Sequence, residues 1–132
     1  MNYHIKNRNY VQKLLWADTL LGGSTAISGI CFFNLLTPIL GLPTAVILGI
    51  SIVTLLYSIV ALVLANQQTI SISVLRTLVF ANWFWTIISI GLLLIYFNEA
   101  ALLGRIFLIL QVVVVGALAY LEGRQIIRDT NN

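Results

Sequence analysis

Four long apolar runs, separated by short polar or turn-forming breaks, fill most of the chain. The runs cover approximately residues 14–36, 43–65, 73–97 and 102–121. Each run is long enough to cross a bilayer as a helix, which needs about 20 apolar residues. Thr37-Pro38 marks the first break, and Pro43 suits the first turn of the next helix, where its missing N–H costs no hydrogen bond. The pattern predicts an all-α, four-helix transmembrane bundle that forms a single domain over residues 1–132.

The composition favours the same interpretation. Of the 132 residues, 60% are hydrophobic and only 8% are charged, whereas a soluble domain carries about 25% charged residues. So few charges cannot cover a surface that faces water, but lipid can solvate such a surface. The net charge of +3 does not indicate a nucleic-acid partner, because the basic residues flank the apolar runs and form no continuous stripe.

The basic residues also predict the orientation of the helices. Arg105 alone lies on one side of the membrane, and the other six lie on the opposite side. These six are Lys6, Arg8, Lys13, Arg76, Arg124 and Arg128. Cytoplasmic loops carry the excess of Lys and Arg in membrane proteins. We therefore expect both chain ends to lie in the cytoplasm.

A weak internal similarity indicates that the four helices are two duplicated helical hairpins. A shift of 63 residues aligns Tyr57 with Tyr120, and a one-residue gap brings Asp18 onto Asn82. Duplicated hairpins of this kind would form a parallel repeat around an axis along the membrane normal. Helices of similar composition also match by chance, so duplication and coincidence both remain open.

Polar side chains within the apolar runs are the candidates for function, because each is costly in lipid unless it is satisfied. Asp18 is followed at helical spacing by Gly22, Ala26 and Gly29. This spacing places the carboxylate on a face of small residues that another helix can approach closely. Each of the other runs carries a comparable polar stripe. The candidate polar seam consists of Asp18, Tyr57, Asn82, Trp85, Gln111 and Glu122.

The expected depth of these residues allows two interpretations. Four of the six (Asp18, Tyr57, Asn82 and Glu122) lie in the cytoplasmic third of their helices, and Gln111 lies nearer the middle. They could converge on a pocket for a ligand or proton that opens toward the inner leaflet. They could instead form interhelical hydrogen bonds that hold the bundle, each worth about 0.6 kcal/mol on average. Glu122 is the weakest member, because it lies close enough to the end of its run to reach cytoplasmic water.

No catalytic, metal-binding or cofactor motif stands out. His4 is the only histidine and lies in a polar tail, so a Ser or Cys nucleophile has no His base. A metal site needs several His, Cys or carboxylate ligands close together, and only Asp18 and Glu122 are candidates. We expect no catalytic residues, no cofactor and no metal.

The Asp18 and glycine pattern, the sequence Asn-Trp-Phe-Trp at 82–85, and Gln111 resemble uncharacterised small four-helix proteins of the bacterial inner membrane. The resemblance covers almost the whole chain. It implies a four-helix bundle in the bacterial inner (plasma) membrane and implies no activity. Small multidrug transporters fit poorly, because they centre on a Glu in helix one, where this chain has Asp18 nearer the helix end. Quinone-linked thiol oxidoreductases need a Cys pair that this sequence lacks.

Three functional classes remain open. The first is a non-catalytic accessory or scaffold subunit, or a protein that binds lipid or a small hydrophobic ligand; short loops and the lack of catalytic groups favour it. The second is a proton-coupled small-molecule carrier that uses Asp18. The third is a membrane enzyme acting on lipid or isoprenoid, with Asp18 and Glu122 as acid and base. The expected partners are membrane lipid and a larger membrane complex or a homo-oligomer, not nucleic acid.

Overall fold

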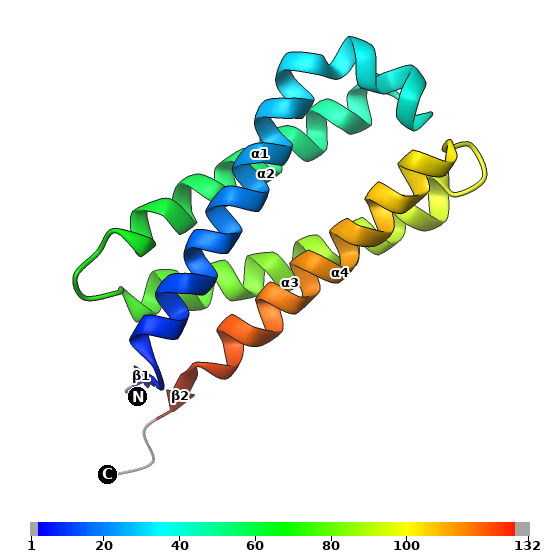
Figure 1. The fold of residues 1–132 in the computed structure, drawn as a ribbon. Coiled ribbons are helices and arrows are strands. Elements are labelled where there is room, and N and C mark those ends of the chain that lie inside the picture. Colours follow the sequence, from blue (N-terminus) through cyan, green and yellow to red (C-terminus); the bar gives the residue numbers. More distant parts are fainter. Residues whose placement is uncertain (1–2, 129–132) are drawn as a thin grey trace.

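The computed structural model describes residues 3–128 and contains four long helices (Figure 1). They are α1 (Arg8–Leu40), α2 (Thr44–Ala65), α3 (Ile72–Tyr96) and α4 (Leu102–Arg124). Two three-residue strands flank the helices: β1 (Tyr3–Ile5) precedes α1 and β2 (Ile126–Arg128) follows α4. They pair antiparallel with one another. All four helices are long and apolar enough to span a membrane. The predicted all-α transmembrane four-helix bundle is confirmed.

The main difference from the predicted spans concerns the end of α1. The helix does not stop before Pro38 but continues to Leu40, where Gly41 (φ 67°) adopts the left-handed conformation that glycine favours. The backbone leaves helical geometry at Phe32 (φ −124°, ψ 22°). Pro38, which has no N–H for the helix ladder, lies just beyond this point. The last part of α1 therefore bends away from the first part (Figure 1).

The helices pair as two antiparallel hairpins, α1–α2 and α3–α4, with more extensive contact within each hairpin than between them. Small residues allow the close approach of α1 and α2. A Cβ placed on Gly22 would lie 3.3 Å from the carbonyl oxygen of Thr54, and one placed on Gly29 would overlap Ser51 Oγ. The predicted small-residue face of α1 thus packs against α2, in the way that small residues join membrane helices.

α1 and α4 are tied to one another at both ends of the bundle. Near the chain ends, β1 pairs with β2, and the Lys6 N–H donates a 2.7 Å hydrogen bond to the Gln125 carbonyl. At the far end, the Ala101 N–H donates to the Leu40 carbonyl at 2.9 Å. Gly104 faces the same carbonyl so closely that a Cβ there would overlap it. The bend in α1 brings Leu40 into this position.

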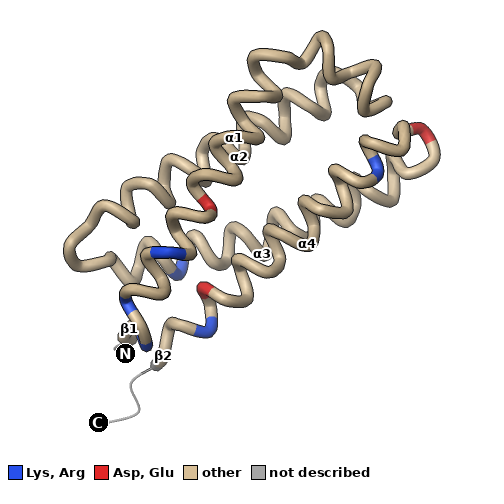
Figure 2. The backbone as a smooth tube through the Cα atoms, viewed as in Figure 1, with Lys and Arg blue, Asp and Glu red and all other residues tan. Residues whose placement is uncertain are grey.

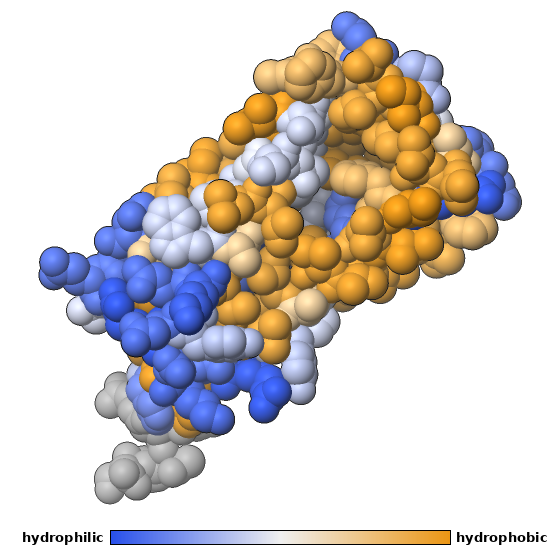
Figure 3. Space-filling model, viewed as in Figure 1, coloured by the Kyte–Doolittle hydropathy of each residue, from blue (hydrophilic) through white to orange (hydrophobic). Residues whose placement is uncertain are grey.

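Most charged residues lie toward the two ends of the bundle, and Asp18 lies within α1 between them (Figure 2). Lys and Arg residues gather at the end that holds β1 and β2, whereas Arg105 and Glu99 lie at the opposite end (Figure 2). Apolar side chains cover most of the surface between these ends on the face seen in Figure 3. This distribution is typical of helices that cross a hydrocarbon layer.

The Gly104 contact can be tested with a single methyl group. Gly104→Ala would press its Cβ against the Leu40 carbonyl. We expect the free energy of unfolding, measured by SDS titration of detergent-solubilised protein, to fall by about 1–3 kcal/mol, as for other overpacked sites. Gly91→Ala is the matched control, because nothing from a neighbouring helix lies within 4 Å of its added Cβ. Equal stability of the two variants would contradict the close contact.

Candidate functional site

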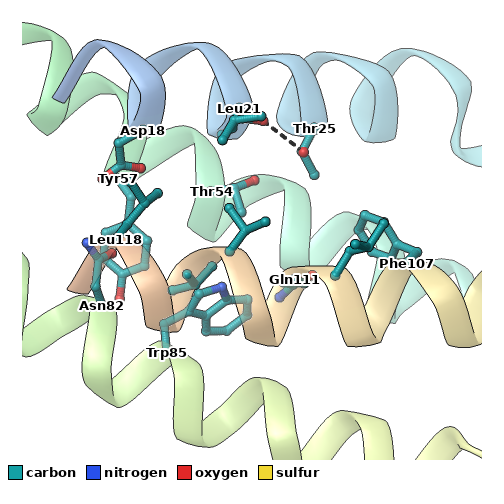
Figure 4. Close-up of a pocket in the computed structure, with 14 residues that line it drawn as sticks. Asp18, Leu21, Thr25, Thr54, Tyr57, Asn82, Trp85, Phe107, Gln111 and Leu118 are labelled. Atoms are coloured by element: carbon teal, nitrogen blue, oxygen red, sulfur yellow. Dashed lines mark hydrogen bonds between the residues drawn. The ribbon is translucent and has the colours of Figure 1, made fainter. Parts of the chain in front are cut away.

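A cavity of about 280 Å³ lies between the two hairpins, and all four helices contribute to its lining (Figure 4). We call it the inter-hairpin cavity. It is lined by Asp18, Leu21, Gly22, Thr25, Thr54, Tyr57, Asn82, Trp85, Phe107, Leu110, Gln111, Val114, Val115 and Leu118. Most of the lining is apolar. Asp18, Tyr57 and Asn82 gather at one end of the cavity, and Phe107 lies toward the other (Figure 4).

Five of the six residues of the predicted polar seam line this cavity. They come from four different helices, and the tertiary fold brings them to one cavity. Glu122 is the sixth; it does not line the cavity but lies beside Asp18, with which it interacts electrostatically. The six polar side chains therefore form one connected group.

Two members of this group make interhelical hydrogen bonds. Gln111 Nε2 on α4 donates to Ser89 Oγ on α3 at 2.9 Å. The Tyr57 hydroxyl on α2 donates to the Ala81 carbonyl on α3 at 3.0 Å. These bonds match the hypothesis that the polar residues join the helices. They account for only part of the group.

The other members have buried atoms without a hydrogen-bond partner in the described part of the chain. The unpaired atoms are Asp18 Oδ2, Asn82 Nδ2, Trp85 Nε1 and both carboxylate oxygens of Glu122. Asp18 has Asn82 and Glu122 as electrostatic neighbours, but these atoms do not meet hydrogen-bond geometry. All four side chains are at least nine-tenths buried. Buried polar groups without partners are rare in native proteins, and they indicate a ligand or water site.

Glu122 is the weakest member of the seam in the sequence pattern, because the end of its run could reach cytoplasmic water. Its side chain is 0% exposed, so it belongs with the buried polar residues. The chain turns at Gln125 directly after α4 and pairs β2 with β1, so Glu122 does not lie at an open helix end. The side chains that act on Asp18 and Glu122 are Asn82 and the two carboxyl groups themselves, with no Lys or Arg among them. The two carboxyl groups lie together without a protein cation.

The cavity opens at the side of the bundle, and its opening toward the inner leaflet stays a prediction. An apolar cluster fills the bundle on the terminal side of Asp18, with fully buried members on α1 (Val11, Leu15), α2 (Leu64) and α3 (Leu75). The surface is hollowed between α1 and α4, with hydrophilic atoms at the base and apolar atoms around the rim (Figure 3). The cavity thus faces sideways, toward the region that lipid chains occupy.

A second cavity, of about 320 Å³, continues along α1 toward Leu40. It shares Thr25 and Phe107 with the inter-hairpin cavity. Its wall combines apolar residues with small hydroxyl-bearing ones such as Ser51, whose hydroxyl donates to the Ile47 carbonyl of its own helix at 2.7 Å. The sequence interpretation missed this region. A row of Ser, Thr and Gly on one face of α1 was the available signal.

The site agrees with the proposed internal duplication at one aligned pair of residues and differs from it at another. Asp18 and Asn82, which the repeat aligns, lie beside one another in the inter-hairpin cavity. Tyr57 and Tyr120 have different surroundings: Tyr57 lines the cavity, whereas Tyr120 is exposed and lies against Arg124. Duplication therefore stays a hypothesis.

The comparisons with known proteins leave the site to be interpreted from its own chemistry. No protein-family model, no curated protein and no solved structure matches the chain. Within residues 3–128, no group of three or more His, Cys, Asp and Glu side chains is placed to hold a metal ion. The fold itself defines the class: a multi-pass α-helical membrane protein.

The Gln111–Ser89 bond should contribute to the stability of the bundle. In a double-mutant cycle of Gln111→Leu and Ser89→Ala, we expect a coupling energy of about 0.6 kcal/mol, the average for such bonds in membrane proteins. SDS titration of the four proteins measures it. Thr77→Ala is the control partner for Gln111→Leu, because the Thr77 hydroxyl bonds only within α3. Zero coupling at Ser89, or equal coupling at both positions, would contradict the assignment.

Proposed function

We propose that this protein is a non-catalytic membrane protein that binds a lipid-derived or other small hydrophobic molecule between its two helical hairpins. The inter-hairpin cavity is the observation that carries this proposal, because Asp18, Asn82 and Trp85 in its lining have buried polar atoms without partners among the described residues, as does Glu122 beside Asp18. A site of this kind, mostly apolar with a few converging polar groups, is the usual architecture for small-molecule binding.

A role limited to joining the helices explains less of the structure. Hydrogen bonds that hold a bundle should pair the buried polar atoms, as the amide nitrogen of Gln111 does with Ser89. At Asp18, Asn82 and Glu122 the buried atoms are not paired. Leaving a buried polar group unpaired costs about 1–3 kcal/mol, and more for charged groups. Retention of these groups beside a cavity favours a ligand that supplies their partners.

Access from the side supports a membrane-borne ligand. The hollow between α1 and α4 lies on the apolar face of the bundle (Figure 3). Leu21 and Leu110 line the cavity and are about half exposed, so they form part of its rim. A molecule dissolved in the bilayer would pass this rim without crossing a polar surface.

The two other functional classes receive less support. A proton-coupled carrier needs access from both membrane surfaces in turn, and the apolar cluster around Leu15 and Leu75 fills one end of the bundle. An enzyme acting on a phosphorylated lipid needs a cation for the phosphate, and the cavity lining holds no Lys or Arg. Asp18 and Glu122 do lie together, as an acid–base pair would require, so this geometry leaves the enzyme class as the third candidate.

The bacterial inner membrane is the proposed location, with both chain ends in the cytoplasm. The gathering of basic residues at the end that holds β1 and β2 supports this orientation through the positive-inside rule (Figure 2). The resemblance to small four-helix bacterial proteins supports the choice of membrane. A larger membrane complex or a homo-oligomer remains part of the proposal for its partners.

Ligand binding can be tested by filling the cavity. Thr25 lines both cavities, and its hydroxyl bonds only to Leu21 of its own helix at 2.8 Å, so Thr25→Phe breaks no interhelical bond. We expect native mass spectrometry of protein purified in mild detergent to show a bound small molecule on the native protein. The bound fraction should fall at least about tenfold in Thr25→Phe, because the ring occupies the site.

The matched control is Ile27→Phe, which places the same ring on the same helix at a side chain that is 61% exposed. It should retain the small molecule at the native level. Co-purification of stable protein partners without any small molecule, unchanged by either substitution, would favour the accessory-subunit hypothesis and contradict ligand binding.

The orientation can be tested with single cysteines in a Cys31→Ala background. Glu99→Cys and Lys6→Cys place thiols at opposite ends of the bundle. A membrane-impermeant maleimide should label Glu99→Cys in intact spheroplasts and Lys6→Cys only after the membrane is permeabilised. The reverse pattern would mean that the basic end faces outward.

A further inference from the structure

The pair of carboxyl groups at the end of the inter-hairpin cavity lacks a positive partner. Asp18 is 7% exposed and Glu122 is 0% exposed, and they interact with one another. The side chains that act on them are Asn82 and the two carboxyl groups themselves, and none of these is a Lys or Arg. Two like charges repel strongly in a medium of low dielectric constant. The pair therefore requires either a proton or a positive charge that the protein itself does not provide.

The cavity next to the pair suits a cation with an apolar body. Asp18 is the only charged side chain in the lining, and the indole ring of Trp85 forms part of the same wall. Aromatic faces attract cations, and a desolvated carboxylate binds an ammonium group through charge-assisted hydrogen bonds. A phosphate or carboxylate head group would instead add a third negative charge at this point. The chemistry of the lining therefore disfavours anionic lipids.

The path that continues from the cavity suits a long chain. The second cavity begins at Thr25 and Phe107 and extends to Leu40, with Leu36, Ile47 and other apolar residues in its wall. The two cavities share Thr25 and Phe107, and together they are lined by residues of α1 from Asp18 to Leu40, on both sides of the bend near Phe32. The charged carboxyl group of Asp18 lies at one end of these cavities, as an amphiphile with one charged head and one tail would require.

We propose that the protein selects a long-chain amine, whose ammonium group lies against Asp18 beside Glu122 and whose alkyl chain follows α1 into the second cavity. The inference rests on the proposed function of ligand binding and adds the chemical class of the ligand. Asp18 contacts the ammonium group directly. Glu122 acts through the negative potential that it adds beside Asp18, and is therefore a positioning residue.

The test compares three probes that share one chain and differ in head charge: dodecylamine, dodecanol and dodecanoate. The protein is held in nanodiscs of phosphatidylcholine, with Trp16→Phe and Trp83→Phe substitutions, so that Trp85 in the cavity lining is the only tryptophan. Trp85 fluorescence then reports occupancy. We expect dodecylamine to bind about tenfold or more tightly than dodecanol, the discrimination that a hydrogen bond to a charged group supplies. Dodecanoate should bind more weakly than dodecanol.

The ratio of amine to alcohol affinity separates recognition of charge from general damage to the fold. In Asp18→Asn the ratio should fall to about one, because the neutral amide removes the charge-assisted bond while alcohol binding reports that the cavity persists. Glu122→Gln should give an intermediate ratio. Glu99→Gln is the control, because it removes an exposed carboxyl group at the opposite end of the bundle, and it should leave the ratio unchanged.

The outcomes distinguish the two proposals. Equal affinity for dodecylamine and dodecanol in the native protein would overturn the amine inference and leave ligand binding intact, with a proton neutralising the carboxyl pair. Failure of all three probes to change Trp85 fluorescence would contradict the proposed function together with this inference. The comparison in the native protein decides the matter even if Asp18→Asn does not fold.

Discussion

A bundle surrounded by hydrocarbon must pair its polar side chains internally, because the solvent offers them no hydrogen bonds. Most hydroxyl groups here meet this constraint locally, by donating to a carbonyl of their own helix; examples are Ser51, Thr54 and Thr86. Gln111 and Tyr57 meet it through bonds to α3. In and beside the inter-hairpin cavity, Asp18, Asn82, Trp85 and Glu122 have buried polar atoms that do not meet it among the described residues, and so does the Oε1 atom of Gln111. All of these side chains lie in or beside the inter-hairpin cavity, so this cavity is where the bundle departs from complete internal pairing.

The same cavity follows from the way the two hairpins are joined. Within the first hairpin, Gly22 and Gly29 let α1 and α2 approach closely. Between the hairpins, α1 and α4 are tied at their ends, through the β1–β2 pair and through the Leu40 carbonyl. The bend near Phe32 allows α1 to reach that second contact. α1 and α4 are therefore held together at both ends. The inter-hairpin cavity, with its polar side chains, lies between these two contacts and opens toward lipid.

Asp18 and Glu122 show where sequence reasoning about the site succeeds and where it stops. Asp18 was predicted to face the interior because glycines follow it at helical spacing, and periodicity of this kind is a local property of the chain. Glu122 is the weakest seam candidate in the sequence, because it lies near the end of an apolar run where it could reach water. It is buried shortly before β2, which pairs with β1, so that two strands of three residues from opposite ends of the chain meet there. No local pattern in such short segments specifies a partner so distant in sequence.

Hydropathy by itself determined that the chain forms four membrane-spanning helices, and helical periodicity identified five side chains that line one cavity. Hydropathy and helical periodicity both depend on residues that are close together in sequence, so the sequence alone reveals them. The tertiary structure alone decided that the cavity opens between α1 and α4, that it continues to Leu40, and that Glu122 joins Asp18 without a cation. These features depend on distances between helices, and those distances are set by the bend in α1, by glycine contacts and by the ties at both ends. A one-dimensional pattern contains none of them.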